Sequence, residues 1–151
     1  MVVQLDILLK EKIQKRKEIN FGLNKVKTYK SFAKRVLNNR KKLIEIFTKL
    51  ILHKKKIIGY GATAKSTTIL NYCNIDNNYI SYFLDTTKDK QKKLTPGTKI
   101  PIMKYQKELL KNVDYIFLGA WNFKKEIFNK EKRFISNGGK FILHTPIPKI
   151  I

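Results

Sequence analysis

The chain has 151 residues, 42% of them hydrophobic and 11% aromatic, which predicts a single globular domain with a substantial core. Its one cysteine, Cys73, excludes an intramolecular disulfide and a cysteine-rich zinc site. No apolar run is long enough for a membrane span, and the N-terminus lacks the apolar region of a signal peptide. We therefore expect a cytoplasmic protein with no membrane partner.

The net charge of +22 raises the question of a polyanionic partner. Only four of the 33 basic residues are arginines, whereas recognition of bases and phosphates favours the arginine fork. The lysines are spread along the whole chain beside isoleucine and asparagine, as a compositional bias on solvated faces would produce. Nucleic acid is thus an unfavoured partner, and the surface is expected to attract anionic small molecules and acidic protein surfaces.

Two amphipathic helices are predicted in an N-terminal helical segment, residues 1–54. In the first, between Val3 and Ile19, apolar residues recur at broadly helical spacing; they are Leu5, Leu8, Leu9, Ile13 and Ile19. In the second, Ser31 is the expected N-cap. One face of that helix carries Phe32, Val36, Leu43, Phe47, Leu50 and Ile51. We interpret this face as a core stripe and the basic residues off it as a solvated face.

A Rossmann-like α/β domain is predicted over residues 55–151, packed with the helical segment as one compact unit. It begins with a buried strand, a glycine turn and a helix in residues 56–72. Gly59, Gly61 and Ala64 fit the G-x-G-x-x-G/A fingerprint, and Asp85 lies at the expected distance downstream. We expect Gly59 to permit a tight turn and Gly61 to let backbone N–H groups approach a phosphate.

Further strands and helices alternate after the glycine loop. The predicted strands are 80–84, a short extended piece at 100–102, 113–118 and 140–144, and the predicted helices are 105–111 and 123–135, with Asn122 as N-cap of the second. The near-continuous apolar strands favour a mostly parallel sheet flanked by helices on both faces. Ligands of such sheets bind at the carboxyl ends of the strands.

Three residues of the chain have alternative interpretations. Asp85 either reaches a ribose hydroxyl or caps the loop that follows it. His144 either faces the cleft or is structural, and Cys73 is interpreted as a small buried hydrophobe. The acids form no convincing acid–base pair, and neither metal-ligand spacing nor a catalytic motif is evident. The site is suited to holding a nucleotide or phosphate, with no evident catalyst and no metal ligands.

Several motifs together resemble the C-terminal domain of sugar C-methyltransferases. They are Gly59–Cys73, Asp85-Thr86-Thr87, Lys90-Gln91, Thr95–Ile102, Trp121-Asn122 and Gly138–Phe141. The resemblance extends from about Phe21 to the C-terminus. It implies a Rossmann-like domain that packs on an S-adenosylmethionine-binding methyltransferase domain, itself preceded by a zinc-binding domain, and helps to enclose a nucleotide-linked sugar. The implied reaction is methyl transfer to a carbon of a keto-sugar after a base removes the adjacent proton, although some relatives are described only as methyltransferases.

The chain departs from this family pattern in lacking the zinc and methyltransferase domains, with their cofactor loop and catalytic base. Ser66 also stands where many relatives have glycine. We therefore expect no catalytic residue here, and S-adenosylmethionine is expected in a methyltransferase domain or subunit acting as partner. The resemblance implies substrate contacts at Gly59, Tyr60, Gly61, Ala62, Lys65, Ser66, Asp85, Trp121 and Asn122.

Two other functions stay open on the sequence. Asp85 after the second strand favours a free-standing dinucleotide-binding module or small oxidoreductase. The high positive charge favours a basic nucleic-acid-binding domain. The leading hypothesis is the substrate-binding domain of a sugar-type methyltransferase, with the N-terminal helices as its docking surface.

Overall fold

The computed structural model describes residues 2–151, and for residues 2–6 and 8 it describes the backbone alone. The chain divides into two compact units, Met1–Asn38 and Asn39–Ile151. No helix in the described part of the chain is both long enough and apolar enough to cross a membrane.

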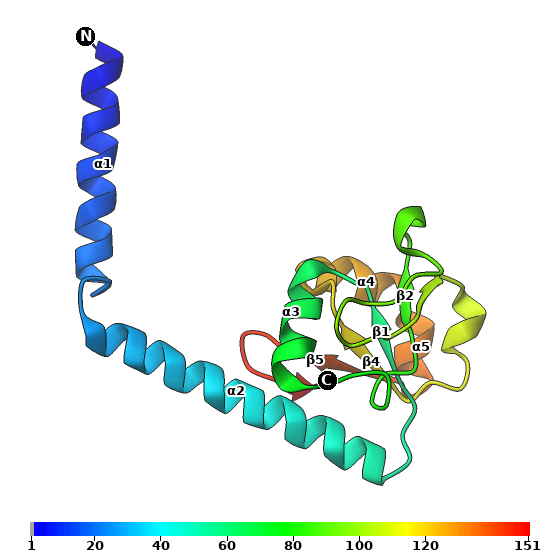
Figure 1. The fold of residues 1–151 in the computed structure, drawn as a ribbon. Coiled ribbons are helices and arrows are strands. Elements are labelled where there is room, and N and C mark those ends of the chain that lie inside the picture. The colour runs from blue at the N-terminus through cyan, green and yellow to red at the C-terminus, as the bar shows by residue number, and fades with distance from the viewer. Residues whose placement is uncertain (1) are drawn as a thin grey trace. The chain divides into compact units, whose positions relative to one another are not determined.

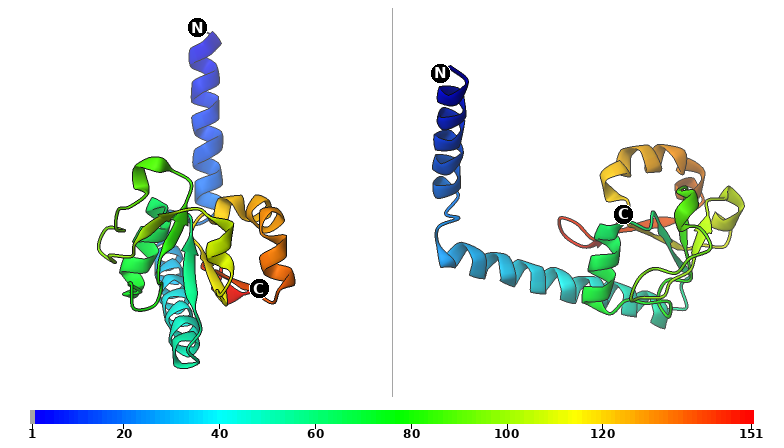
Figure 2. Two further views of the ribbon diagram at one scale, coloured as in Figure 1. Left: turned by 90° about the vertical axis from the view of Figure 1, so that its right-hand side faces the viewer. Right: turned by 45° about the horizontal axis from the view of Figure 1, so that its top comes forward.

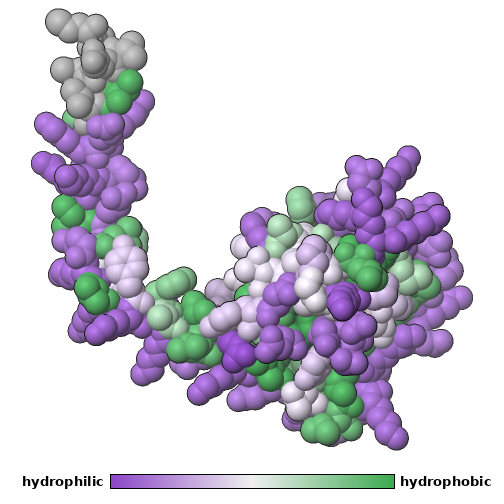
Figure 3. Space-filling model, viewed as in Figure 1, coloured by the Kyte–Doolittle hydropathy of each residue, from purple (hydrophilic) through white to green (hydrophobic). Residues whose placement is uncertain are grey.

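The first unit consists of α1 (Val2–Asn20) and the beginning of α2 (Val26–Leu52), which confirms the two predicted N-terminal helices (Figure 1). Successive residues of a helix are rotated by about 100°, so the apolar residues of α1 lie on several sides of the helix rather than on one face. Those with described side chains are all exposed; they are Ile7, Leu9, Ile13 and Ile19. Leu5 and Leu8, also predicted for this face, lie outside the described side chains. Figure 3 shows apolar and hydrophilic side chains interspersed along these helices.

The predicted N-cap of α2 is wrong. The helix begins at Val26, more than one and a half turns earlier than expected, so Ser31 lies inside it and its hydroxyl accepts a hydrogen bond from Arg35 Nη1 at 2.9 Å. Phe32 and Ile51, at the two ends of the predicted stripe, are exposed. The stripe is confirmed where the helix enters the second unit, because Leu43, Phe47 and Leu50 are buried.

The second unit contains a six-stranded sheet in the order β3-β2-β1-β4-β5-β6. The strands are β1 (Ile57–Tyr60), β2 (Phe83–Asp85), β3 (Ile102–Lys104), β4 (Tyr115–Leu118), β5 (Lys140–Leu143) and β6 (Lys149–Ile150). The first five are parallel, and β6 runs antiparallel to β5. This confirms the predicted Rossmann-like, mostly parallel sheet and adds β6, which was not predicted.

Helices cover both faces of the sheet (Figures 1 and 2). They are α3 (Ala64–Cys73), α4 (Lys124–Lys130) and α5 (Lys132–Ser136), with the 3₁₀ turns η1 (Lys88–Lys90), η2 (Lys107–Leu110) and η3 (Trp121–Phe123). One core layer joins Phe47 of α2 and Leu70 of α3 to the sheet. The other joins Ile127 of α4 and Phe134 of α5 to the opposite face. Successive strand residues alternate between the two layers, as the two-residue period of a strand requires.

The predicted helix 123–135 is divided in two. Glu131 leaves helical geometry at φ −103° and ψ 27°, which separates α4 from α5. Asn122 lies inside η3, so it is not the predicted N-cap, and the residue at that position, Phe123, makes no side-chain capping bond.

The edge of the sheet at β3 is covered by the loop that precedes it. Lys92 N–H donates to the carbonyl of Ile102, and Ile102 N–H donates to the carbonyl of Lys93, both at 2.8 Å. Leu94 and Pro101 form a further antiparallel bridge. The long polar segment after β2 is therefore ordered against the sheet.

Candidate nucleotide-binding site

A pocket of about 370 Å³ lies where the carboxyl ends of β1, β2 and β4 meet. In the order β3-β2-β1-β4, the chain leaves β1 towards one side and reaches β4 on the other, so this is the switch point at which such sheets bind ligands. We call it the switch-point pocket. It is lined by Tyr60, Gly61, Thr63, Leu84, Asp85, Thr86, Thr87, Lys90, Tyr105, Ala120, Phe123, Glu126, Ile127 and Lys130.

The two fingerprint glycines serve close packing. Gly61 has φ +78°, and a Cβ there would lie 2.5 Å from the Cβ of Ala120. Gly59 lies within β1, and a Cβ at that position would lie 2.3 Å from the ring of Phe83 on the neighbouring strand. The turn therefore occurs at Gly61, and Gly59 makes room for an aromatic ring instead of forming the predicted turn.

The backbone N–H groups of the glycine loop are used within the chain. Gly61 N–H donates to the carbonyl of Leu84 and Ala62 N–H to Asp85 Oδ2, both at 2.8 Å. Thr63 is the N-cap of α3 and forms a capping box with Ser66, whose side chain is buried. Ser66 thus caps the N-terminus of α3 rather than lining the pocket, and the N–H groups of Gly61 and Ala62 are not available to an anion there.

Asp85 organises the two loops that border the pocket. It is 7% exposed; Oδ2 accepts from Ala62 N–H, and Oδ1 accepts from Thr87 N–H at 2.8 Å. Burial alone would raise the pKa of Asp85, but these hydrogen bonds together with the charge of Lys90 outweigh it and lower the pKa. The carboxylate is therefore ionised at neutral pH and bonded to the chain itself.

Lys90 connects the same loops from the pocket side. Its ammonium donates to the carbonyl of Ala62 at 2.9 Å and lies 3.5 Å from Asp85 Oδ2. Gln91 Nε2 donates to the backbone carbonyl of Asp85 at 3.1 Å. These contacts place a partly exposed cation at the carboxyl end of β2.

Two tyrosines and a lysine line another part of the pocket. The rings of Tyr60 and Tyr105 lie 5.7 Å apart, and their hydroxyls donate to Glu131 Oε1 at 3.1 and 2.8 Å. Burial, reinforced by Glu131, raises the pKa of both tyrosines, so their hydroxyls stay protonated. The ammonium of Lys130 lies 3.6 Å from the centroid of the Tyr105 ring.

A neighbouring pocket of about 490 Å³ contains two more of the predicted site residues. Trp121 and Asn122 line it, and it shares Phe123 and Glu126 with the switch-point pocket. Lys65 of α3 is not among the lining residues, but its ammonium lies 5.5 Å from the Trp121 ring centroid. We call this the Trp121 pocket.

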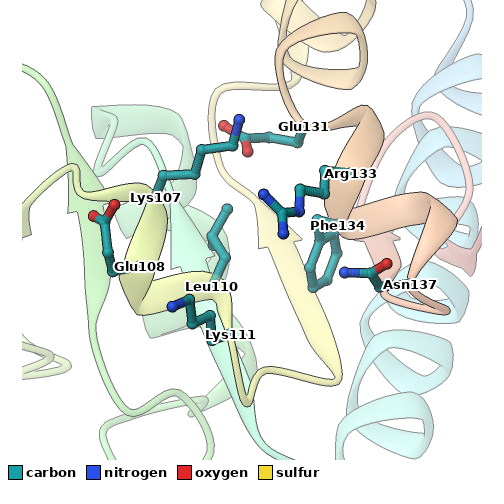
Figure 4. Close-up of a pocket in the computed structure, with 8 residues that line it drawn as sticks. All are labelled: Lys107, Glu108, Leu110, Lys111, Glu131, Arg133, Phe134 and Asn137. Atoms are coloured by element: carbon teal, nitrogen blue, oxygen red, sulfur yellow. The ribbon is translucent and has the colours of Figure 1, made fainter.

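A groove of about 260 Å³ lies between η2 and α5 (Figure 4). Lys107 and Lys111 line one side, Arg133 and Asn137 line the other, and Glu131 lies at one end. Glu131 is 1% exposed, and its Oε2 has no hydrogen-bond partner among the described residues. The carboxylate therefore has one oxygen bonded to the tyrosines of the switch-point pocket and the other unbonded.

Two further groups lie in the core. His144 stacks on Phe117 at 5.3 Å between ring centroids, and burial lowers its pKa to about 4, so the imidazole is neutral at pH 7. Cys73 is buried, and burial raises the pKa of its thiol, as expected of an unreactive cysteine. Neither residue lines the switch-point or Trp121 pocket.

The sequence places this architecture in a known family. Residues 10–148 match the family described as the C-methyltransferase C-terminal domain. The chain belongs to this family. It is also 36% identical over 130 residues to the C-methyltransferase NovU of Streptomyces niveus, an alignment covering 86% of this chain and 31% of that protein. The chain thus spans about a third of the curated relative, and the match confirms the family resemblance seen in the sequence.

C-methyltransferases use S-adenosylmethionine as methyl donor, which raises the question of whether the glycine loop of this C-methyltransferase C-terminal domain could hold it. In Rossmann-type sites the acid after the second strand binds the ribose hydroxyls. Here that acid, Asp85, is buried and bonded to the N–H groups of Ala62 and Thr87. The carboxylate of Asp85 is therefore not available to bind the ribose of S-adenosylmethionine in the usual way, so the loop does not fit that cofactor and we assign no step to it.

The nine predicted contacts are distributed over three places. Tyr60, Gly61 and Asp85 line the switch-point pocket, whereas Trp121 and Asn122 line the Trp121 pocket, next to Lys65. The rest are packed within the domain; they are Gly59, Ala62 and Ser66.

Residues missed as contacts line the switch-point pocket as well. Lys90 was present in the sequence only as part of a family motif. Tyr105 and Lys130 carried no local signal, because the chain brings them together from separate elements.

Proposed function

We propose that this chain is the part of a sugar-type C-methyltransferase that binds the nucleotide-linked sugar. The observation that carries the proposal is the switch-point pocket itself. It combines two lysines, Lys90 and Lys130, with the aromatic side chains of Tyr60, Tyr105 and Phe123. Cations suit a diphosphate, and aromatic faces suit a base or a sugar ring.

The ligand proposed here extends from the switch-point pocket into the Trp121 pocket. The two pockets share Phe123 and Glu126, and their volumes of about 370 and 490 Å³ lie in the range of small-molecule sites. At the far end of the ligand, Lys65 would provide a positive charge and Trp121 an aromatic face. Gly61 contributes by letting the loop lie close to Ala120, another residue of the pocket lining.

In this proposal the methyl transfer itself takes place on a methyltransferase domain or subunit outside these 151 residues. S-adenosylmethionine and the base that removes the substrate proton belong to that partner. The basic N-terminal helices are proposed as the docking surface. Their exposed apolar residues, such as Ile13 and Ile19, stand among lysines and suit a partner surface that is partly apolar and partly acidic.

Titration calorimetry with UDP-glucose and dTDP-glucose tests the proposal. The chain is expected to bind at least one of them, and Lys65→Ala is expected to weaken binding in the complex with its methyltransferase. Absence of binding by the chain, together with unchanged binding by Lys65→Ala in the complex, would refute it. Lys132→Ala, which removes an exposed lysine outside both pockets, is the matched control.

A dinucleotide-binding module is the second candidate, favoured by Gly61 and by the acid at the end of β2. It is the weaker one, because Asp85 would have to release Ala62 and Thr87 to reach a ribose. Retention of a nicotinamide cofactor on purification would support it. A nucleic-acid-binding domain would instead show affinity for DNA or RNA that falls steeply with salt.

A further inference from the structure

Lys130 is held at the switch-point pocket by aromatic faces and not by a counter-ion. Its ammonium lies 3.6 Å from the centroid of Tyr105 and 5.9 Å from that of Tyr60. Within the described part of the chain no carboxylate forms an ion pair with it, although Glu126 lines the same pocket one turn earlier on α4. A cation held by a ring face keeps its full charge and its N–H donors for a ligand.

The next residue, Glu131, fixes the rings on which Lys130 rests. Glu131 lies at the break between α4 and α5, where its carboxylate accepts hydrogen bonds from the hydroxyls of Tyr60 and Tyr105. The ammonium of Lys130 lies over the faces of the same two rings. A phenol that donates to a carboxylate is polarised towards the ring, and this strengthens the attraction between the ring face and a cation. The neighbouring side chains thus act on opposite parts of the same tyrosines.

The charge of Glu131 is not required for packing. A buried carboxylate with an unpartnered oxygen carries a desolvation cost, and Glu131 is 1% exposed with Oε2 unbonded. A glutamine oxygen could accept both tyrosine hydroxyls without that charge. A buried charge that lowers stability and lies beside a pocket is typical of a functional site.

We propose that Lys130 is an anion-binding residue of the switch-point pocket, and that Tyr105 and Glu131 position it. The ligand group is a phosphate or diphosphate. The proposal deepens the proposed function, because that group would be the diphosphate of the nucleotide-linked sugar. Since the N–H groups of Gly61 and Ala62 are used within the chain, a lysine takes the role that the glycine loop has in other Rossmann folds.

The test uses the full chain with pyrophosphate, UDP and uridine as probes in titration calorimetry. Lys130→Ala is expected to weaken pyrophosphate and UDP binding about tenfold or more, the effect of losing one charged hydrogen bond, and to leave any uridine binding unchanged. Lys132→Ala, on α5, removes the same charge from an exposed position outside the pocket and should change neither by more than about twofold. Equal affinities in the two variants would overturn the proposal.

Glu131→Gln separates positioning from structure. We expect its melting temperature to be unchanged or higher, because the buried charge is removed, while its pyrophosphate affinity falls towards that of Lys130→Ala. Wild-type affinity in a folded Glu131→Gln variant would refute the positioning role. Pyrophosphate binding through Lys130, combined with no nucleotide-sugar binding by the chain and unchanged binding by Lys65→Ala in the complex, would refute the proposed function alone. A wild-type chain that binds neither pyrophosphate nor UDP would refute the role of Lys130.

Discussion

Replacing Asp85 by asparagine tests whether this residue holds the pocket loops together. The carboxylate accepts two backbone N–H groups at 2.8 Å, from Ala62 and Thr87, and lies 3.5 Å from the Lys90 ammonium. Asparagine offers only one acceptor oxygen, so its NH₂ group must face one of the two N–H donors. The position is 7% exposed, so water cannot readily satisfy that donor.

Leaving one buried donor unsatisfied costs about 1–3 kcal/mol. Loss of the partly exposed ion pair with Lys90 adds less than about 1 kcal/mol. We therefore expect Asp85→Asn to lower the free energy of unfolding by about 2 kcal/mol. For a domain of this size, the melting temperature should fall by roughly 8 °C. Urea and thermal unfolding followed by circular dichroism measure both quantities. Asp89→Asn, an exposed acid on the same loop, is the control.

The pH dependence gives a second measurement of the same contacts. The folded-state pKa of Asp85 is lowered, so the folded protein binds fewer protons here than the unfolded chain does. The stabilisation is therefore complete above the unfolded pKa of about 3.9 and is lost as the pH falls through the folded pKa. The difference in the free energy of unfolding between wild type and Asp85→Asn should be largest at pH 7 and should decrease at acid pH. A variant as stable as wild type at pH 7 would refute the assigned role.

Three other predictions follow from packing and burial. Gly61→Ala places a Cβ 2.5 Å from that of Ala120 at φ +78°, so we expect a loss of about 2 kcal/mol or more in urea unfolding. Phe47→Ala empties a fully buried site between helix and sheet and should cost about 3–5 kcal/mol by the same assay; a loss below about 1 kcal/mol would contradict the packing. Burial holds the pKa of His144 at about 4, below its value of about 6.5 in the unfolded chain, so this residue makes the protein lose stability as the pH falls from about 6.5 to 4. His144→Phe should flatten the stability profile in that window, and an unaltered profile would argue against the assignment.

The sequence predicted what depends on local pattern. The apolar runs at β1, β4 and β5 and the turn chemistry between them identified the strands, and their alternation with helices identified a parallel sheet. Gly59, Gly61 and Asp85 identified the first β–α unit and the second strand end. The family motifs were specific enough to identify the domain.

What the sequence did not predict depends on partners far along the chain. Gly59 looked like a turn residue because the ring of Phe83, which needs the space, comes from another strand. The break at Glu131 could not be predicted because the hydroxyls that bind its carboxylate come from Tyr60 and Tyr105. The sequence did not distinguish Lys130 from the other lysines, because the Tyr105 ring beneath its ammonium comes from a distant part of the chain.

The two margins of the sheet constrain how this domain can associate. An uncovered strand edge can recruit a strand from another chain, and proteins counter this with short, charged or covered edges. At β3 the loop through Lys92 and Lys93 already occupies the backbone groups of Ile102. At the other margin β6 is two residues long and begins with Lys149. Strand addition is therefore disfavoured at both edges of the sheet. A partner that docks on this domain is expected to contact side chains of helices and loops, so the residues on those surfaces determine which partner binds.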